Sequence, residues 1–552
     1  MKAVTLRSAR TIMITDRLES NEAAIHRLVD DILTYIFFLN ATTPDSDGRE
    51  HATTVASSQV CMRWRSIALQ CHTIWGPIID YSRHSLKWIE TLLDRSHPSP
   101  LDFGSRIARV NTVSLLDGGQ GVLELVFNHI DRLRTFYLEF PESCWDLVCS
   151  RFLQLPAPNL EFVKIVITFG DHPGLGQTRV RRVAQLMHQM FNHHAPNLQN
   201  LQLRRCTVDF TSPILTRLTE LDVRDISHSR ACPTVLDWIN ILGGMPTLRW
   251  VKLIRAISSS MPNVIYPIIP LAALEMLSVE DGFRESVTMI EHLIAPRCGL
   301  KLICDDAHVG SDQRKLWAII KKKVDSWANN APNRYLEVWS NQGRFSFGNL
   351  HRGLELGWDM EGEAIHHKSH NIHIQDPVII VMLFFSNPQD TFNPLLSLFA
   401  MFERTFFDTT HLKLSIDFGP DIRPEIFLPL VDMFRSFVNL KELYLGFDSL
   451  MLLFLPLLQR SLPDSVFLPA LQSLKLYNAM FRYPSKSLPR VAEFLRWRGE
   501  QGFPVQKVHI ANSRITRQYI QYILNLVQVQ DTVFEIGDNC SDVDSEWVGL
   551  DR

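Results

Sequence analysis

The stretch LQNLQLRRCTV, residues 198–208, decides the fold of most of this chain. Its apolar residues Leu198, Leu201 and Leu203 are spaced by three and then two positions, which predicts a short β-strand with one apolar face. Pro196 lies two residues before the stretch, where a preceding helix is expected to stop. The local sequence therefore predicts a unit made of a helix, a stop and a short strand.

The same apolar-x-x-apolar-x-apolar pattern returns along most of the chain. Its clear copies begin at Leu133, Leu160, Leu198, Leu218, Leu248, Leu274, Leu440, Leu471 and Val505, and a weaker copy begins at Val110. Apolar residues at helical spacing lie between copies, in Arg182–His193, Val235–Leu242, Glu285–Ile294, Ile426–Phe437 and Val491–Trp497. Alternating helices and short strands predict an α/β fold with parallel strands joined by crossovers.

The repeated unit resembles the leucine-rich repeat, in which each repeat buries its apolar face by stacking on its neighbours. Residues 198–208 match that family well and place Cys206 where Asn or Cys is usual. The other copies have different residues at this position, namely Ala256, Gly282, Asp448 and Ala479. The resemblance therefore implies an irregular, horseshoe-shaped repeat solenoid over residues 106–536, in which residues 305–435 hold either degenerate repeats or an insertion.

A different pattern occupies the N-terminal part of the chain. The stretch IHRLVDDILTYIF, residues 25–37, has apolar residues spaced by three and four, which predicts an amphipathic helix. A polar loop, NATTPDSDGR at 40–49, separates it from a second apolar stretch, SSQVCMRWRSIAL at 57–69. Short helices of this size cannot bury all these apolar groups among themselves, so an exposed apolar patch is expected to bind a partner.

These N-terminal stretches resemble the F-box, a three-helix module, and in particular the F-box proteins of mushroom-forming fungi. The resemblance implies an F-box domain at 21–80, after an extension at 1–20, that docks on a Skp-type adaptor and through it on a cullin. The adaptor-binding residues that the motif implies are Leu28, Ile32, Leu33, Ile36, Val60 and Trp64.

The chain departs from the F-box pattern at two positions. Val29 stands where proline is usual, and Asp31 stands where glutamate is usual. Losing the proline removes a rigid start of the helix, which leaves open whether docking is weakened or lost. A further alternative is that Ile32, Ile36 and Trp64 are simply core residues of the module.

The remaining segments complete the predicted organisation. Residues 81–105, which contain Pro98, Pro100 and Gly104, are interpreted as a linker, and residues 537–552 as an acidic, disordered tail. On the repeat domain, the residues between the inward-facing positions are expected to face a bound protein substrate. The candidates at these positions are Gln202, Asp222, Lys252, Ser278, Tyr444 and Lys475.

The composition narrows the class of protein. The 552 residues are 46% hydrophobic and 21% charged with a net charge of −3, which is typical of a folded chain and favours neither nucleic acid nor a membrane surface as partner. The nine cysteines are scattered without a CxxC pair, which favours reduced thiols in the cytoplasm or nucleus. The apolar runs Val378–Phe385 and Leu450–Leu458 are far shorter than the roughly 20 residues that span a bilayer.

Motifs of known chemistry are missing from the sequence. It contains no GxSxG, HExxH, P-loop or GxGxxG pattern, so no catalytic residue and no cofactor is predicted. The histidines His366, His367, His370 and His373 form one tempting cluster, but an exposed loop is favoured over a zinc site. Basic residues at 179–182 and 321–323 fit solvated helix faces, with a small anion-binding patch as the alternative.

The expected function is therefore that of the substrate-recognition subunit of a Skp–cullin–F-box ubiquitin ligase. Such a subunit contributes proximity between ligase and substrate and no bond chemistry of its own. The alternative is a leucine-rich-repeat interaction scaffold without ligase coupling, which Val29 keeps open. A third hypothesis, an enzyme with an unfamiliar site in residues 305–435, depends on the histidine cluster alone.

Overall fold

The computed structural model divides the chain into two compact units, Met1–Leu218 and Thr219–Arg552. Its described residues form a mixed α/β fold built on parallel strands. The structure describes residues 28–43, 50–104, 119–141, 145, 148–149, 153–168, 184–185, 190–227, 229, 231–258, 264–296, 298–305, 311–328, 335–341, 344–349, 379–384, 409–416, 437–446, 468–477, 487–511 and 533–536. No helix in these ranges combines the length and the apolar character needed to cross a membrane.

The first described elements of the first unit are the helices α2 (Asp30–Thr42), α3 (Glu50–Ser57) and α4 (Met62–Gln70), followed by the short 3-10 turn η2 (His72–Ile74). The helix α2 includes the first residues of the predicted loop 40–49, of which 44–49 lie outside the described residues. Phe37 packs edge-on against Trp64, with ring centroids 5.3 Å apart. These contacts give the module a small core of its own.

The prediction of a linker over residues 81–105 is wrong. This segment contains the helix α5 (Leu86–Ser96) and the strand β1 (Leu101–Phe103), and the apolar residues of α5 are buried. The Phe103 ring stacks on Phe136 at 5.4 Å, and the Arg132 side chain donates to the Ser99 carbonyl at 3.0 and 2.8 Å. The segment buries too much apolar surface to be a linker. Its prolines and glycine lie instead at the ends of packed elements.

The sheet of the first unit has the strand order β1, β2 (Leu133–Pro141), β3 (Phe162–Thr168) and β5 (Asn200–Arg204), with every neighbouring pair parallel. Other elements of this unit are α6 (Gly119–Phe127), η4 (Ile130–Arg132), β4 (Ala184–Gln185), β6 (Cys206–Thr207) and η7 (Pro213–Arg217). The helix predicted over Arg182–His193 is not found among its described residues. They form the strand β4 and the 3-10 turn η6 (Met190–His193), in which Phe191 and Asn192 have positive φ values of 54° and 48°.

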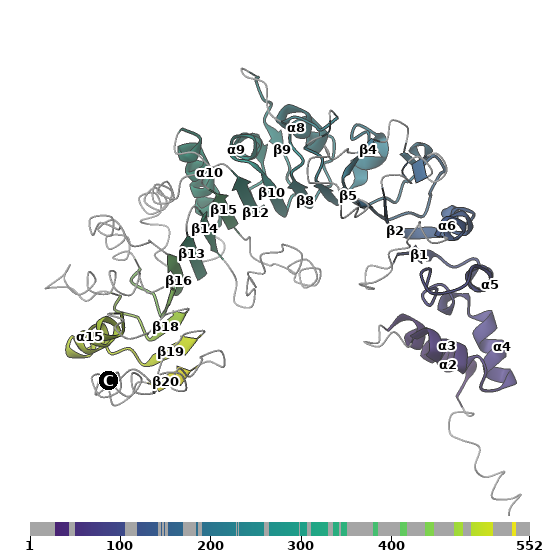
Figure 1. Cartoon of the computed structure of the whole chain (residues 1–552), viewed down its shortest axis with the longest axis horizontal. Helices are drawn as coiled ribbons and strands as arrows, with labels where there is room; N and C mark the ends of the chain where they lie inside the picture. Colours follow the sequence, from purple (N-terminus) through teal and green to yellow (C-terminus); the bar gives the residue numbers. More distant parts are fainter. Residues whose placement is uncertain are drawn as a thin grey trace, which may run out of the picture. The chain divides into compact units, whose positions relative to one another are not determined.

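The second unit begins with four parallel strands in register, β7 (Glu220–Arg224), β8 (Trp250–Ile254), β10 (Met276–Gly282) and β12 (Gly299–Asp305). The helices α8 (Val235–Gly243), α9 (Phe283–His292) and α10 (Ser311–Ala328) lie side by side along one face of these strands (Figure 1). A capping box between Thr234 and Asp237 fixes the start of α8. The small strands β9 (Ile269–Pro270) and β11 (Leu293–Ile294) pair with each other.

An antiparallel strand interrupts the parallel run further along the second unit. The strands are β13 (Tyr335–Asn341), β14 (Arg344–Asn349), β15 (Ile379–Phe384) and β16 (His411–Ile416), and their order in the sheet after β12 is β15, β14, β13, β16. The strand β14 is antiparallel to both of its neighbours. Of the two alternatives for residues 305–435, the described strands therefore fit an insertion better than degenerate repeats.

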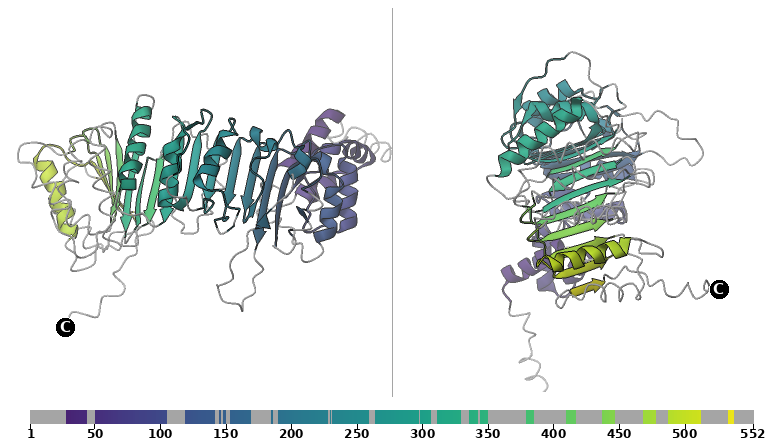
Figure 2. Two further views of the ribbon diagram at one scale, coloured as in Figure 1. Left: turned by 90° about the horizontal axis from the view of Figure 1, so that it is seen from above. Right: turned by 90° about the vertical axis from the view of Figure 1, so that its left-hand side faces the viewer.

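The parallel arrangement then resumes in β17 (Glu442–Gly446), β18 (Ser473–Tyr477), β19 (Lys507–Ala511) and β20 (Val533–Ile536), with the helix α15 (Ser487–Glu500) before β19 (Figure 2). Each of the nine clear copies of the apolar pattern forms a strand whose apolar residues are buried, while the copy at Val110 lies outside the described residues. The predicted helices at Val235–Leu242, Glu285–Ile294 and Val491–Trp497 are confirmed as α8, α9 and part of α15. Of the predicted helix Ile426–Phe437, only Phe437 is described.

Candidate functional site

The N-terminal helices expose large apolar side chains on a module that has a core of its own. We call this set the N-terminal apolar patch: Val29, Ile32, Tyr35 and Leu39 on or next to α2, and Val60 and Met62 at the start of α4. The exposed fractions are 46% for Ile32, 58% for Val60, 62% for Val29 and 89% for Met62. This patch is therefore the candidate binding surface of the module.

Arg63 links the start of α4 to the start of α2. Arg63, next to Met62, donates from Nη2 to the Leu28 carbonyl at 2.5 Å and from Nε to the Asp30 carboxylate at 3.0 Å. The first turn of α4 is thereby held against the first turn of α2. Exposed apolar residues flank this contact in the sequence: Val29 lies between Leu28 and Asp30, and Met62 precedes Arg63.

The adaptor-binding residues implied by the motif are divided between surface and core. Ile32 and Val60 are exposed, whereas Leu28, Ile36 and Trp64 are half-buried. Leu33 is fully buried, so its assignment to the contact surface is corrected: it belongs to the core of the module. The motif does not identify the exposed residues Val29, Tyr35, Leu39 and Met62. The spacing of Val29, Ile32 and Leu39 places these three on one face of the helix, and this signal is present in the sequence.

The backbone at Val29 already has the conformation that the missing proline imposes. Val29 is the N-cap residue of α2, with φ −70° and ψ 156°, and among the described residues its N–H donates no hydrogen bond. Because proline fixes φ near −65° and lacks an N–H, Val29→Pro is expected to stabilise α2 by about 0.4–1 kcal/mol. Hydrogen exchange of the α2 amides in the full chain measures the effect, with Val29→Ala as the control. Faster exchange in the proline variant would contradict the expectation.

The six predicted substrate-facing residues all lie on the sheet face opposite the apolar core. Gln202, Asp222, Lys252, Ser278, Tyr444 and Lys475 are half-buried, and each alternates with fully buried residues of its strand. In the first unit, Gln202 pairs with Lys164, which pairs with Tyr137. The Lys164 ammonium lies 4.5 Å from the centre of the Tyr137 ring. A cation–π contact therefore already occupies this lysine.

In the second unit the other five residues fall into two rows of paired positions. The first, which we call the Asp222 row, runs across four adjacent strands through Asp222, Lys252, Ser278 and Lys301. The second, the Tyr444 row, runs through Lys413, Tyr444, Lys475 and His509. The structure therefore brings Asp222, Lys252 and Ser278 together, and separately Tyr444 and Lys475. Lys301 was not among the predicted residues, because its strand lacks a clear copy of the pattern.

The Tyr444 row carries its own neutralising carboxylate. The Lys475 ammonium donates to Glu442 Oε2 at 3.0 Å and to the Tyr444 hydroxyl at 2.5 Å, and that hydroxyl donates to Glu442 Oε2 at 3.1 Å. Burial alone lowers the pKa of Lys475, but the hydrogen bonds with Tyr444 and Glu442 outweigh it and raise the pKa above its usual value. Lys475 is therefore a stable cation inside a closed triad.

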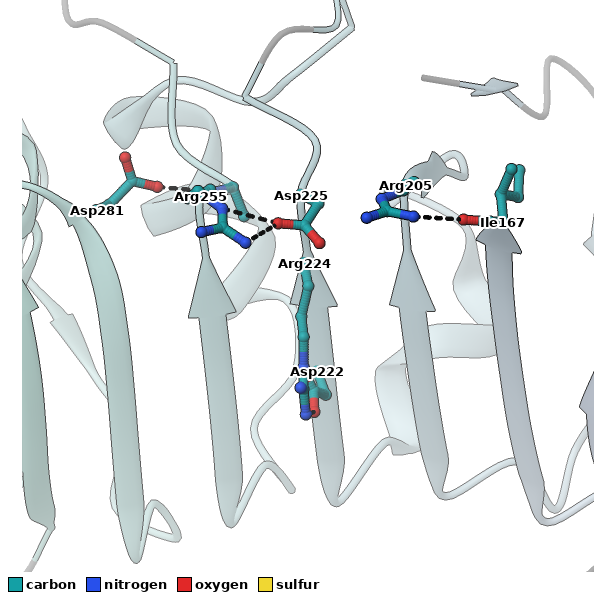
Figure 3. A network of polar contacts seen from close by, with 8 residues as sticks. Ile167, Arg205, Asp222, Arg224, Asp225, Arg255 and Asp281 are labelled. Atoms are coloured by element: carbon teal, nitrogen blue, oxygen red, sulfur yellow. Dashed lines mark hydrogen bonds and ion pairs between the residues drawn. The ribbon is translucent and has the colours of Figure 1, made fainter. Parts of the chain in front are cut away.

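The Asp222 row differs from the Tyr444 row in the pKa of its lysines. The Asp222 carboxylate accepts two hydrogen bonds from Arg224, at 2.8 and 2.7 Å (Figure 3). Burial, followed by the positive charge of Arg224, lowers the pKa of Lys252 from 10.5 to about 7, although Asp222 and Glu280 act in the opposite direction. Burial also lowers the pKa of Lys301. The carboxylates of this surface therefore do not offset the cost of burying its two lysines.

Polar side chains just beyond the strand ends form hydrogen bonds with the backbone of neighbouring chain segments. In the first unit, Cys206 donates to the Ile165 carbonyl at 3.9 Å and Arg205 to the Ile167 carbonyl at 3.3 Å (Figure 3). In the second unit, the carboxylate of Asp281 accepts from the N–H groups of Ala256 and Ile257, at 2.7 and 2.8 Å.

A different side chain therefore satisfies the backbone groups at each of these turns. Asp281 also accepts from Gly282 N–H at 2.9 Å. Asp225 and Arg255 form an ion pair in the same region (Figure 3). Both have positive φ, 60° and 46°, directly after the ends of β7 and β8.

Most of the other residues that the sequence suggests as binding or metal sites lie outside the described residues. The histidines at 366–373 and the acidic tail at 537–552 lie outside the described residues, as do Arg179, Arg181 and Arg182. Within the described ranges, no three His, Cys, Asp or Glu side chains are grouped as metal ligands. Comparison with protein-family models finds no match for this chain, and comparison with curated proteins finds none either.

Proposed function

We propose that this chain is the substrate-recognition subunit of a Skp–cullin–F-box ubiquitin ligase. In this proposal the helices α2 to α4 are an F-box that docks on a Skp-type adaptor, and the parallel strands belong to an irregular leucine-rich-repeat solenoid that holds a protein substrate. The chain then acts by proximity, since it holds the substrate next to the conjugating enzyme and transfers nothing itself.

The N-terminal apolar patch is the observation that carries the proposal. Its side chains stay exposed although the module has its own packed core, with Leu33 and Phe37 fully buried. Leaving such surface in water is unfavourable by roughly 25 cal/mol per Å², and a partner that covers it recovers that free energy. The conformation of Val29 supports the same reading, because the helix start that proline usually imposes is present without it.

Copurification with a Skp-type adaptor from a eukaryotic host tests the docking step. The double variant Ile32→Asp, Val60→Asp is expected to weaken retention of the adaptor at least about tenfold, because each aspartate would be buried without a partner in the interface. The matched control is Ile265→Asp, which places the same charge at a side chain that is 92% exposed in the second unit. Hydrogen exchange of α2 and α4 checks that the double variant keeps its fold.

Three outcomes are informative. Binding by the native chain and the control, with loss in the double variant, supports the proposal. Binding by all three chains means that the adaptor does not use the N-terminal apolar patch. No binding by the native chain favours the alternative function, an interaction scaffold without ligase coupling, for which the departure at Val29 is the specific reason.

A further inference from the structure

Three half-buried polar side chains on the strand face of the second unit take part in no hydrogen bond within the described residues. They are Ser278, Glu280 and Lys301. Lys252, which pairs with Ser278 from β8, has contacts of its own and is not one of them. In the Tyr444 row, by contrast, the lysine and the carboxylate are bonded to each other. The fold therefore leaves one hydroxyl, one carboxylate and one ammonium group of this face available to a partner.

The strand register places these three side chains together. Ser278 pairs with Lys301 across the parallel strands β10 and β12, and Glu280 pairs with Ile303, two residues further along the same strands. Alternate residues of a strand point to the same face, so all three side chains project from one side of the sheet. Neighbouring strands lie about 4.8 Å apart and alternate residues about 6.6 Å apart, so the three Cα atoms lie within roughly 8 Å of one another.

The group carries charges of both signs. Burial lowers the pKa of Lys301 and the Glu280 carboxylate opposes this effect, so the two charges are close enough to act on each other. Within the described residues, however, no ion pair joins them. A ligand that fits must present an acceptor to the ammonium and a donor to the carboxylate. A neutral ligand is favoured, because an added charge of either sign would meet a like charge.

A primary carboxamide meets these requirements better than a peptide bond of the main chain. Its carbonyl oxygen and one of its N–H groups lie on the same edge, so it can accept from Lys301 and donate to Glu280 on one surface. In a trans peptide bond the C=O and the N–H point in opposite directions, so one of them would face away from the sheet. The hydroxyl of Ser278 lies next to both charged groups and can donate or accept.

Apolar side chains border the group on two sides. Ile254 and Ile303 pair with Glu280 from the neighbouring strands β8 and β12. Met276 lies two residues before Ser278 on β10. The three apolar residues are half-buried, so their exposed parts can cover the methylene groups of a glutamine or asparagine side chain and the flanking residues of an extended segment.

We infer that Ser278, Glu280 and Lys301 bind the side-chain carboxamide of a glutamine or asparagine on an extended segment of a partner protein. The carboxamide oxygen accepts from the Lys301 ammonium, its N–H donates to the Glu280 carboxylate, and the Ser278 hydroxyl adds a third contact. That the partner is a ubiquitination substrate rests on the proposed function, whereas the carboxamide site rests on this strand face alone.

Photo-crosslinking of the full chain, without any adaptor present, tests the inference. The probe is an acetylated pentapeptide of alanines with glutamine at its centre and a photoreactive benzophenone residue beside it, closed by an N-methylamide so that glutamine carries its only primary carboxamide. Two control peptides have methionine or glutamate, which are similar in length and shape, in place of the glutamine. We expect the glutamine peptide to label β8, β10 and β12 about three to ten times more than either control, the factor that one net hydrogen bond contributes.

Variants of the chain separate this site from general adhesion to the strand face. Lys301→Met removes the donor and is expected to abolish the preference for the glutamine peptide over the methionine peptide. Glu280→Gln removes the like charge and is expected to raise labelling by the glutamate peptide. The matched control is Lys87→Met, the same replacement at an exposed residue of α5 in the first unit, which is expected to leave all three yields unchanged.

Two results would overturn the inference: equal labelling of the native chain by all three peptides, or a glutamine preference that survives Lys301→Met. Stronger labelling of the native chain by the glutamate peptide would also overturn it, because the face would then select an anion. Failure of adaptor copurification leaves these results untouched, so the two proposals fail separately.

Discussion

Replacing Asp281 by alanine is expected to destabilise the ends of β8 and β10 by about 2–4 kcal/mol. The Asp281 carboxylate accepts the backbone N–H groups of Ala256, Ile257 and Gly282. Ala256 and Ile257 are buried, so water does not easily replace the lost acceptor, and each unsatisfied N–H costs about 1–3 kcal/mol. The variant therefore loses the contacts that hold the backbone just after the end of β8.

Hydrogen exchange of the amides of residues 254–258 measures this effect locally, which avoids assuming that a chain of two units unfolds in one step. Exchange at Ala256 and Ile257 is expected to accelerate at least about thirtyfold in Asp281→Ala. Asp281→Asn is the matched control, since its amide oxygen still accepts the two bonds from Ala256 and Ile257. Equal protection in the alanine variant would show that these amides have another acceptor.

The sequence predicts this contact only in part. The side chains of Ala256 and Gly282 cannot accept a hydrogen bond, and the acceptor is supplied instead by Asp281 on the neighbouring strand. Which side chain fills the role depends on strand register, because Asp281 must reach two amides just after the end of β8. A pattern of single residues does not contain that information.

The strands could be predicted because each copy of the apolar pattern is short and places its apolar residues on one buried face. Leu221, Val251 and Leu277 are paired across β7, β8 and β10 and are at most 2% exposed, so the burial that defines the pattern also fixes the register. The same logic placed Asp222, Lys252 and Ser278 on the opposite face. The charge balance of that face was not predictable, because it depends on which side chains are hydrogen-bonded.

The errors have a different origin. The prolines and the glycine of segment 81–105 predict a linker, although Ile89, Leu92 and Leu93 have the spacing of a buried helical face. The predicted helix at 182–193 shows the reverse case. Its apolar spacing is helical, but positive φ values at Phe191, Asn192 and His193 are incompatible with a continuing α-helix. Local spacing thus fails where turn geometry or tertiary packing decides the conformation.

The second large effect is expected at Lys252. Replacing it by methionine, which has a similar length and no charge, is expected to stabilise the second unit by about 1–4 kcal/mol near pH 7. The folded chain lowers the pKa of this lysine from 10.5 to about 7, through burial first and Arg224 second, so folding a charged Lys252 is unfavourable. Methionine removes that cost and keeps the contacts of the aliphatic stem.

The pH dependence separates this explanation from a simple gain in packing. Below about pH 7 the lysine is charged in both the folded and the unfolded chain, so the full destabilisation from burying its charge is present. Between about pH 7 and 10.5 only the unfolded chain binds the proton, so this destabilisation shrinks as the pH rises. The difference in urea midpoint between Lys252→Met and the native chain should therefore be larger at pH 6 than at pH 9. Lys475→Met is the contrasting variant, and it is expected to destabilise because it breaks the triad with Glu442 and Tyr444.

A residue that costs stability where methionine would not is typical of a binding site. If Lys252→Met stabilises the unit as expected, the contacts of Lys252 do not offset the cost of its burial, and the exposed strand face around it is where the proposed function would first be tested. If the variant is less stable at both pH values, the contacts of the Lys252 side chain contribute more to stability than its burial costs, and substrate contacts are better sought at other positions of the exposed strand face.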